Sequence, residues 1–457
     1  MPNEHDDAKR ELRHSFALRV TAAAGGMIST FLLTVIVVRT LDPRDTAAFF
    51  AILAALSIGS SVGRLGLGPN VIRLIPAEDD HEAKRVIAGT HLRATVLLTL
   101  LSAPVVSLGA TVGLIGHGDF VLCFVLTTVM ITIETVRMML SDIFAAVGRV
   151  RASVGTMHYL RSVLTVPVVG LVAILSTRPT LVTLLTAYAA VAGTQLAVAL
   201  WLARDNATLS GSRGLGAVSM AIDSGARLFS LDLTAFALVS GTIWIANAAF
   251  SPVTATHYSA AATIAMQVTI LESLAALAVT PPAARLWTAG RKHEVVRLLS
   301  NLATVNVAVT VIIIGALAAL GGVALQLAYG AEMRSASILL VVIACGGIFQ
   351  AAFGVNISLL IICGRIREVS RTAVVILVIA LPISVAAAFF WGPMALAISS
   401  AAGVAALSIA EWLTARRCLD EAPRPHIHLV RAVRELASRS TLAPDDEKSE
   451  PAPNQPN

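Results

Sequence analysis

The stretch LDPRDTAAFFA (41–51) closes the first long apolar segment and opens the second. A similar stretch, FSPVTATHYSA (250–260), lies in the other half of the chain. Aligning Pro43 with Pro252, at an offset of 209 residues, places an aromatic residue six positions beyond each proline. Such self-similarity at a long offset indicates an internal repeat.

Two more pairs of motifs have nearly the same offset. GRVR (148–151) corresponds to GRIR (364–367), 216 residues later, and Pro167 corresponds to Pro382, 215 residues later. These offsets predict two copies of one six-helix unit. Parallel repeats of this kind are typical of transporters whose site lies between the halves, although a duplicated bundle that is only a scaffold has the same pattern.

The composition defines the class of protein. Hydrophobic residues make up 56% of the chain and charged residues 14%, with a mean hydropathy of +0.79. That balance excludes a water-soluble globule and predicts a polytopic membrane protein. The net charge of +6 does not indicate nucleic acid, because basic residues at the ends of apolar segments are explained by anionic lipid and membrane topology.

A helix needs about 20 mostly apolar residues to cross a bilayer. Twelve segments meet this requirement, near 16–39, 47–68, 91–115, 120–146, 158–177, 181–202, 227–249, 256–280, 298–320, 335–362, 372–390 and 394–414. The expected fold is therefore an all-α membrane protein with 12 transmembrane helices in two six-helix bundles, 1–205 and 206–415.

The remaining segment, 416–457, is expected to form a largely disordered cytoplasmic tail. Its end, LAPDDEKSEPAPNQPN, is acidic, contains proline and has too few apolar residues to fold. Before it, HLVRAVRELASR (428–439) has apolar residues at helical spacing. This stretch is compatible with a helix on the inner membrane face or with a solvated helix.

The distribution of basic residues predicts the orientation. One set of loops has only four basic residues, Arg39, Arg44, Arg178 and Arg334. The other set holds many more: Arg10, Arg13, Lys84, Arg85, Arg93, Arg149, Arg151, Arg204, Arg213, Arg285, Arg291, Lys292, Arg297, Arg365, Arg367 and Arg371. Both termini are therefore expected on the cytoplasmic side of a bacterial plasma membrane.

Arg64 is the most informative charge within the spans. A charge at mid-bilayer costs about 2.5–3.5 kcal/mol on insertion scales, so it needs water, a partner or a function. Arg64 lies among Gly63, Gly66 and Gly68, which leave space for another group, and its planar guanidinium suits a phosphate. Close helix packing with a snorkelling arginine is the alternative.

Other charges gather in the same cytoplasmic half. Glu134 and Arg137 lie three residues apart on one helix face, where they line a cavity or neutralise each other. Arg19 and Arg161 are candidates for binding an anionic substrate, although arginines near helix ends often snorkel. We take Arg64, Arg137, Arg161 and Arg19 as candidate pyrophosphate-binding residues.

Carboxylates and neutral polar residues complete the candidate site. Asp232 and Glu272 could bind a coupling proton or sodium ion, or form a salt bridge with Arg64 across the two halves. His158, Gln267 and Gln350 are candidate cavity residues, with an interfacial histidine and interhelical hydrogen bonds as the alternatives.

No enzyme chemistry is indicated. The four cysteines have no paired spacing, so neither a disulfide framework nor a zinc site is expected. The sequence has no Walker A motif, no metal-ligand cluster and no nucleophile motif. We expect no cofactor apart from a possible coupling H⁺ or Na⁺.

The amino-terminal region resembles that of the Wzx-type polysaccharide exporters of the multidrug, oligosaccharidyl-lipid and polysaccharide (MOP) superfamily. The resemblance rests on VVRTLDPRDTAAFF, on GLGPNVIRLIP, and on the GRVR and GRIR exits from the fourth and tenth spans. It implies two bundles in a V and a flippase that moves an isoprenoid-pyrophosphate-linked oligosaccharide to the outer leaflet. It also implies membrane lipid, a polymerase and glycosyltransferases as partners. Many relatives have an acidic or small polar residue where Arg64 stands, so the ligand contacts there cannot be carried over.

Three other functions fit parts of the pattern. A cation or drug antiporter of the same superfamily would bind through Asp232 and Glu272. A major-facilitator transporter also has twelve spans, but its basic loop motif after the second span is missing. A membrane-embedded glycan polymerase or ligase would need acidic or histidine residues at the outer face, where Asp42, Asp45, Asp119, Glu332, His117 and His257 do not converge in the sequence.

Overall fold

In the computed structural model, the described residues are 3–204, 219, 222, 229–231, 233–419 and 421–441. Side chains are described from residue 21 onward, except at 158–159, 269–278, 281 and 437–441. All regular structure in these residues is helical, as expected.

The first half contains six long helices, α1 (Asn3–Thr40), α2 (Pro43–Arg64), α4 (His81–Thr111), α5 (Phe120–Ala146), α7 (His158–Leu175) and α8 (Leu181–Ala203). Two short helices, α3 (Leu67–Leu74) and α6 (Val150–Thr156), precede α4 and α7. The second half contains α10 (Gly241–Ala249), α11 (Pro252–Thr288), α12 (Lys292–Tyr329), α13 (Ser337–Phe353), α14 (Val355–Ile362), α15 (Ile366–Trp391) and α16 (Pro393–Cys418). The helix α17 (Leu429–Thr441) follows.

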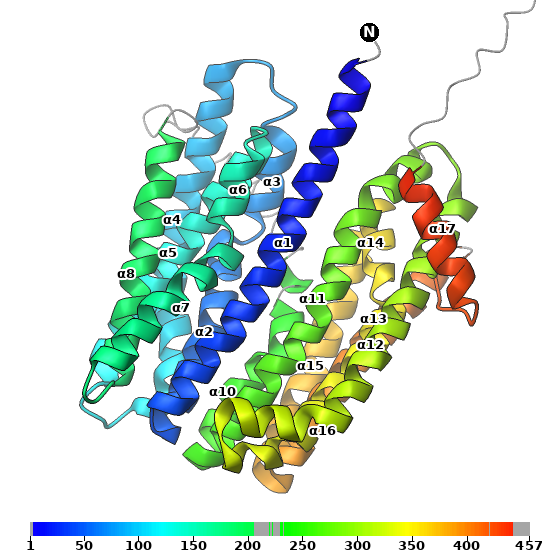
Figure 1. Cartoon of the computed structure of the whole chain (residues 1–457). Coiled ribbons are helices and arrows are strands. Elements are labelled where there is room, and N and C mark those ends of the chain that lie inside the picture. The colour runs from blue at the N-terminus through cyan, green and yellow to red at the C-terminus, as the bar shows by residue number, and fades with distance from the viewer. Residues whose placement is uncertain are drawn as a thin grey trace, which may run out of the picture.

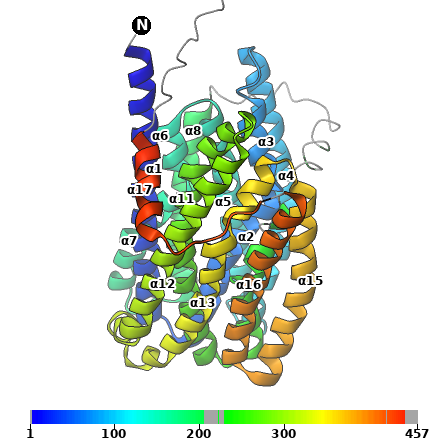
Figure 2. The same cartoon turned by 90° about the vertical axis from the view of Figure 1, so that its right-hand side faces the viewer.

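These helices account for the expected spans. Ten segments of the described chain are long and apolar enough to cross a membrane, and the bent pair α6–α7 makes an eleventh. The 37-residue helix α11 occupies the place of the twelfth expected span. Within each half the helices pack on one another as one bundle (Figures 1 and 2).

Several helices are longer than expected from hydropathy. The segment predicted at 91–115 begins at His81, where the Asp80 side chain accepts hydrogen bonds from two backbone amides of the first turn. The segments predicted at 256–280 and 298–320 belong to α11 and α12. Hydropathy identifies only the part of a helix that matches the hydrocarbon, so capped polar extensions are missed.

The repeated motifs adopt the same local structure in both halves. Pro43 begins α2 and Pro252 begins α11, each at a first-turn position that proline favours. Gly148 and Gly364 have φ of +77° and +73°. This left-handed conformation favours glycine, and the next helix of each half begins two residues later.

The two bundles meet at one end of the molecule. They diverge toward the end that carries the N-terminus and α17, here called the terminal end, and converge at the opposite, distal end (Figure 1). Five hydrogen bonds of the described residues join the halves there. They are Thr34 Oγ1 with Tyr329 Oη at 2.8 Å, Trp244 Nε1 with Ala51 O at 2.9 Å, Thr256 Oγ1 with Pro43 O at 2.6 Å, Arg39 Nε with Ala328 O at 2.6 Å, and Arg39 Nη2 with Leu327 O.

Apolar packing closes the same end. Phe50, Ala51 and Ala54 of α2 are buried in one cluster with Tyr258 of α11 and Leu339 of α13. The distal contacts between the bundles, which we call the distal seal, therefore combine hydrogen bonds, of which that between Thr34 and Tyr329 is buried, with a shared apolar core. The two bundles are therefore closed against each other at the distal end and separated toward the terminal end.

Candidate functional site

A cleft lies between the halves on the terminal side of the distal seal. It consists of two hollows, of about 180 Å³ beside Arg161 and about 440 Å³ beside Arg64. Both are lined by Ser57, Ser240 and Met266, so the two hollows adjoin each other at these residues. We call the two hollows together the central cleft.

Arg64 is placed at the wall of this cleft by the end of α2. It is the last residue of the helix, and the following Leu65 adopts a left-handed conformation with φ of 40°. Its Nη1 lies 2.9 Å from Asp142 Oδ2 on α5, and its Nε donates to Ser60 O at 3.2 Å. The Arg64 and Asp142 side chains keep 18% and 16% of their surface exposed, so this ion pair is reachable from the cleft.

The three glycines around Arg64 have separate roles. A Cβ at Gly68 would collide with the Asp142 carboxylate, and one at Gly63 would collide with Thr99 and Thr135. Gly66 has φ of +72° in the tight connection to α3, where glycine is favoured. The glycines thus allow close packing of α2, α3 and α5 and leave space for the ion pair.

We expect Gly68→Ala to displace Asp142 and break its contact with Arg64. Inserting a methyl group at such a packed position costs about 1–3 kcal/mol, so the melting temperature in detergent should fall. Gly315→Ala is the matched control, because a Cβ there meets nothing within 4 Å. Equal melting temperatures for the two variants would contradict this account of Gly68.

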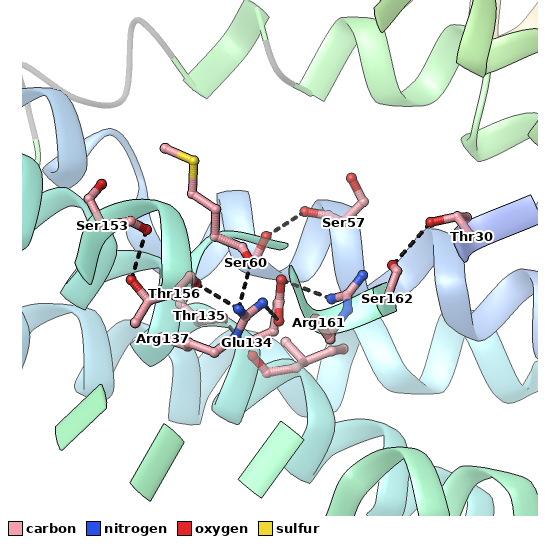
Figure 3. Close-up of polar contacts among 12 residues, drawn as sticks. Thr30, Ser57, Ser60, Glu134, Thr135, Arg137, Ser153, Thr156, Arg161 and Ser162 are labelled. Carbon is pink, nitrogen blue, oxygen red and sulfur yellow. Dashed lines mark hydrogen bonds and ion pairs between the residues drawn. The ribbon is translucent and has the colours of Figure 1, made fainter. Parts of the chain in front are cut away.

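A buried charge network lies behind the wall of the Arg161 hollow (Figure 3). Glu134 on α5 accepts from Arg137 Nη2 at 2.5 Å and pairs with Arg161 Nη1 of α7 at 2.8 Å. Arg137 is fully buried, whereas Arg161 keeps 14% of its side chain exposed. One carboxylate and two guanidinium groups carry a net charge of +1, and the Arg161 side faces the cleft.

The bend between α6 and α7 explains why Arg137 can be buried. The last carbonyls of a helix have no partner within that helix, and α6 ends at Thr156. Arg137 Nη1 donates to Thr156 O at 2.6 Å and to Met157 O at 2.9 Å. Arg137 therefore joins α5 to the α6–α7 break while it neutralises Glu134.

The structure brings four predicted site residues together. Arg64, Arg161, Gln267 and Gln350 line the central cleft. Glu134 and Arg137 lie behind its wall, in an ion pair as one sequence interpretation allowed. The side chains of the remaining candidates lie outside the described residues; these are Arg19, His158, Asp232 and Glu272.

Two residues were missed by sequence reasoning. Asp142 pairs with Arg64, and the Asp232 and Glu272 side chains considered as partners from the sequence lie outside the described residues. Asp142 lies eight residues after Glu134 on α5, about 80° around the helix at 3.6 residues per turn, so the spacing alone gave only a weak signal. Tyr188 lies under the Arg161 guanidinium, 5.5 Å from the ring centroid, and no spacing in the sequence indicates that contact.

The cleft also contains polar atoms that are not satisfied by the protein. Arg161 Nε, Tyr188 Oη and Gln267 Oε1 are buried and have no hydrogen-bond partner among the described residues. Buried polar groups normally have partners. In the described chain, the only charged residues that line the two hollows are Arg64 and Arg161, so the arrangement suits a polar, anionic ligand.

An apolar groove leads sideways out of the cleft between α1 and α11. It has a volume of about 290 Å³ and shares Met27, Thr30, Thr263 and Gln267 with the Arg161 hollow. Ile28 and Phe31 on its rim are exposed. We call this the lateral groove; it connects the polar cleft to the surface that faces lipid.

Three solved structures have a similar fold over nearly the whole chain. The lipid II flippase MurJ, in an inward closed conformation, matches with a TM-score of 0.67 and 10% identity, covering 93% of this chain and 90% of MurJ. An inward-facing multidrug resistance MATE family transporter of the MOP superfamily has a TM-score of 0.62 and 13% identity, covering 88% and 98%. The Vibrio cholerae MATE transporter VcmN has a TM-score of 0.62 and 14% identity, covering 91% and 98%.

The chain has the fold of these MOP-superfamily transporters. No protein-family model matches the sequence, and no curated protein matches it. At these identities the likeness establishes the two-bundle architecture and leaves the substrate to be inferred from the site.

Proposed function

We propose that the protein is a membrane transporter that flips an isoprenoid-pyrophosphate-linked oligosaccharide from the inner to the outer leaflet by alternating access. It would act in cell-surface polysaccharide biosynthesis in the bacterial plasma membrane, like the Wzx-type exporters that its sequence resembles. One observation carries the proposal. The cleft whose described charged lining is Arg64 and Arg161 is continuous with an apolar groove to the lipid surface.

The chemistry of such a substrate matches the two parts of this space. Sugar hydroxyls and a pyrophosphate lose their hydration in hydrocarbon and need polar partners in return. The guanidinium groups and the unsatisfied Tyr188 hydroxyl supply donors in the cleft, while the isoprenoid chain can remain in lipid along the lateral groove. If the cell interior is negative, the membrane potential assists outward movement by about 2.3 kcal/mol per charge per 100 mV.

We expect Arg64→Ala to abolish export while the protein level is unchanged, because the head group loses its guanidinium partner. Export is measured as cell-surface polysaccharide, together with the lipid-linked oligosaccharide that accumulates on the inner leaflet. Arg64→Ala also leaves Asp142 without its partner, so the matched variant is Arg64→Gln with Asp142→Asn, in which no charge is orphaned. Normal export in the double variant would refute the role of Arg64.

A cation-coupled drug antiporter is the second candidate, supported by the similarity to MATE transporters. It would use Asp232 and Glu272 as binding carboxylates and coupling sites for H⁺ or Na⁺. Drug-resistance assays distinguish the two candidates. Loss of resistance in Asp232→Asn or Glu272→Gln with normal polysaccharide export would favour the antiporter, and the converse pattern would favour the flippase. A polymerase and glycosyltransferases of the same pathway are the partners we propose for the flippase.

A further inference from the structure

The chain after α16 folds back onto the second bundle. Residues 421–428 are extended and α17 then returns beside α12 (Figure 2). We call residues 421–441 the C-terminal hairpin. They lie in the segment that the sequence predicted to be largely disordered, and residues 442–457 lie outside the described residues.

Buried polar groups of the bundle hold the first arm of the hairpin. Asn356 of α14 is fully buried and donates through Nδ2 to Pro423 O at 3.3 Å. Thr304 Oγ1 of α12 accepts from the His426 amide at 3.0 Å. Because an unpaired polar group in an apolar setting is costly, these contacts make the hairpin part of the bundle.

Asn301 of α12 joins both arms. Its Oδ1 lies 2.8 Å from His426 Nε2, and its Nδ2 donates to Glu435 Oε2 on α17 at 2.9 Å. Arg431 and Arg297 also pair with Glu435, at 2.9 Å and 3.2 Å. Hydrogen bonds from Arg431 and then Asn301 hold the pKa of Glu435 below its ordinary value, so the carboxylate keeps these contacts near neutral pH.

The opposite side of the hairpin is apolar and exposed. Ile427, at the turn, is 92% exposed, and Val430 and Val433 on α17 are 74% and 50% exposed. Ala432, on the other side of α17, is fully buried. These exposed apolar side chains lie opposite the face of α17 that packs on the bundle. Such an exposed apolar patch indicates contact with a further apolar surface outside the chain.

The turn lies at the depth of the inner membrane surface. Thr304, which binds His426, is 25 residues from the distal end of α12 at Tyr329, about 37 Å at 1.5 Å per residue. The hydrocarbon core is about 30 Å thick. With the distal end at the outer surface, the turn falls just beyond the core, among the head groups of the inner leaflet.

The charge around this apolar stripe complements an anionic surface. The hairpin and the start of α12 carry seven basic residues, Arg291, Lys292, Arg297, Arg424, Arg431, Arg434 and Arg439. They carry three acidic ones, Glu294, Glu421 and Glu435. Glu421 and Glu435 are both paired with residues of α12, while Arg424 and Arg434 are exposed.

We propose that the C-terminal hairpin is a membrane anchor whose apolar turn, Ile427 to Val433, inserts into the inner leaflet and whose arginines bind anionic phospholipid head groups. This is independent of the substrate that the transporter carries. The inserted turn would fix the cytoplasmic end of α12 at the level of the inner leaflet while the first bundle moves against the second.

The test uses the full chain with its native cysteines replaced, reconstituted in nanodiscs with a fluorophore on Ile427→Cys. Leu320→Cys, on the exposed side of α12, serves as the lipid reference, and Ala77→Cys, in the exposed α3–α4 loop, serves as the water reference. We expect nitroxide-labelled lipid to quench the 427 label as strongly as the 320 label. Aqueous iodide should quench the 427 label severalfold less than the 77 label. If iodide quenches the 427 label as strongly as the 77 label, the turn lies in water and the proposal is overturned. No other protein is present in the nanodisc, so shielding of the 427 label cannot come from a protein partner.

A second arm tests the lipid class. Changing phosphatidylcholine to phosphatidylglycerol nanodiscs should strengthen lipid-phase quenching at 427, and Arg424→Gln with Arg434→Gln should weaken that gain by about fivefold per arginine. Melting temperatures equal to that of the parent show that the variants are folded. Equal quenching in the two lipids would reject the anionic head-group contact. Val430→Asp, on the same exposed stripe, should separate the labelled turn from lipid in both.

Discussion

Arg137→Leu should prevent folded protein from accumulating, whereas Arg161→Leu should leave the fold intact and abolish transport. Both arginines contact Glu134. Arg137 is fully buried and also holds the Thr156 and Met157 carbonyls at the end of α6, and each buried acceptor that is left unsatisfied costs about 1–3 kcal/mol. In Arg161→Leu, Glu134 keeps Arg137 as its partner, so only the guanidinium at the cleft is lost.

The measurements are the yield of monodisperse protein and its melting temperature in detergent, with export assayed for the variant that folds. Arg137→Lys is the matched control, because it keeps a cation that can pair with Glu134 and donate to a carbonyl at the end of α6. That variant should recover part of the lost stability. Equal melting temperatures for Arg137→Leu and Arg161→Leu would show that the two residues do not have the separate roles assigned here.

The repeat and the spans could be predicted because they depend on local patterns. An apolar run of suitable length is sufficient to indicate a membrane helix, and the motifs around Pro43 and Pro252 specify the same helix start in each half. The helix ends were less predictable. Arg64 ends α2, within the segment predicted at 47–68, because Leu65 and Gly66 both adopt left-handed conformations, which hydropathy does not detect.

The candidate site was predictable in its residue types and only partly in its contacts. The pairing of Glu134 with Arg137 follows from their spacing on one helix. The third member, Arg161, reaches Glu134 because α6 and α7 meet at a bend of 43°. Asp142 reaches Arg64 across two helices packed at Gly68. Contacts that depend on such tertiary geometry cannot be predicted from the sequence and are seen only in the structure.

The C-terminal hairpin shows a different limit. The helical spacing of apolar residues in 428–439 predicted a helix, and α17 lies there, but the segment considered alone does not predict that residues 421–441 dock on the second bundle. Its order comes from partners far away in the sequence, the buried side chains of Asn301, Thr304 and Asn356. The sequence of residues 416–441 does not indicate that these distant side chains bind the hairpin.

Cross-linking the distal seal should stop transport completely. Thr34 and Tyr329 belong to different bundles and share a buried hydrogen bond, so cysteines at both positions can be joined by a short bifunctional thiosulfonate that spans the space left by the tyrosine ring. Alternating access requires one bundle to rock against the other, and a covalent link at the distal end prevents the outward-open state. Reduction of the linker should restore export in the same cells.

A matched pair within one bundle provides the control. Ser230 and Ser370 both belong to the second half, and their hydroxyls lie 2.7 Å apart. Cysteines there should be cross-linked as efficiently and leave export unchanged, because no relative motion of the bundles passes between them. If the protein linked at 34 and 329 still exports at the rate of the unlinked protein, the distal seal does not open during transport, and rocking about the central cleft is excluded as the mechanism.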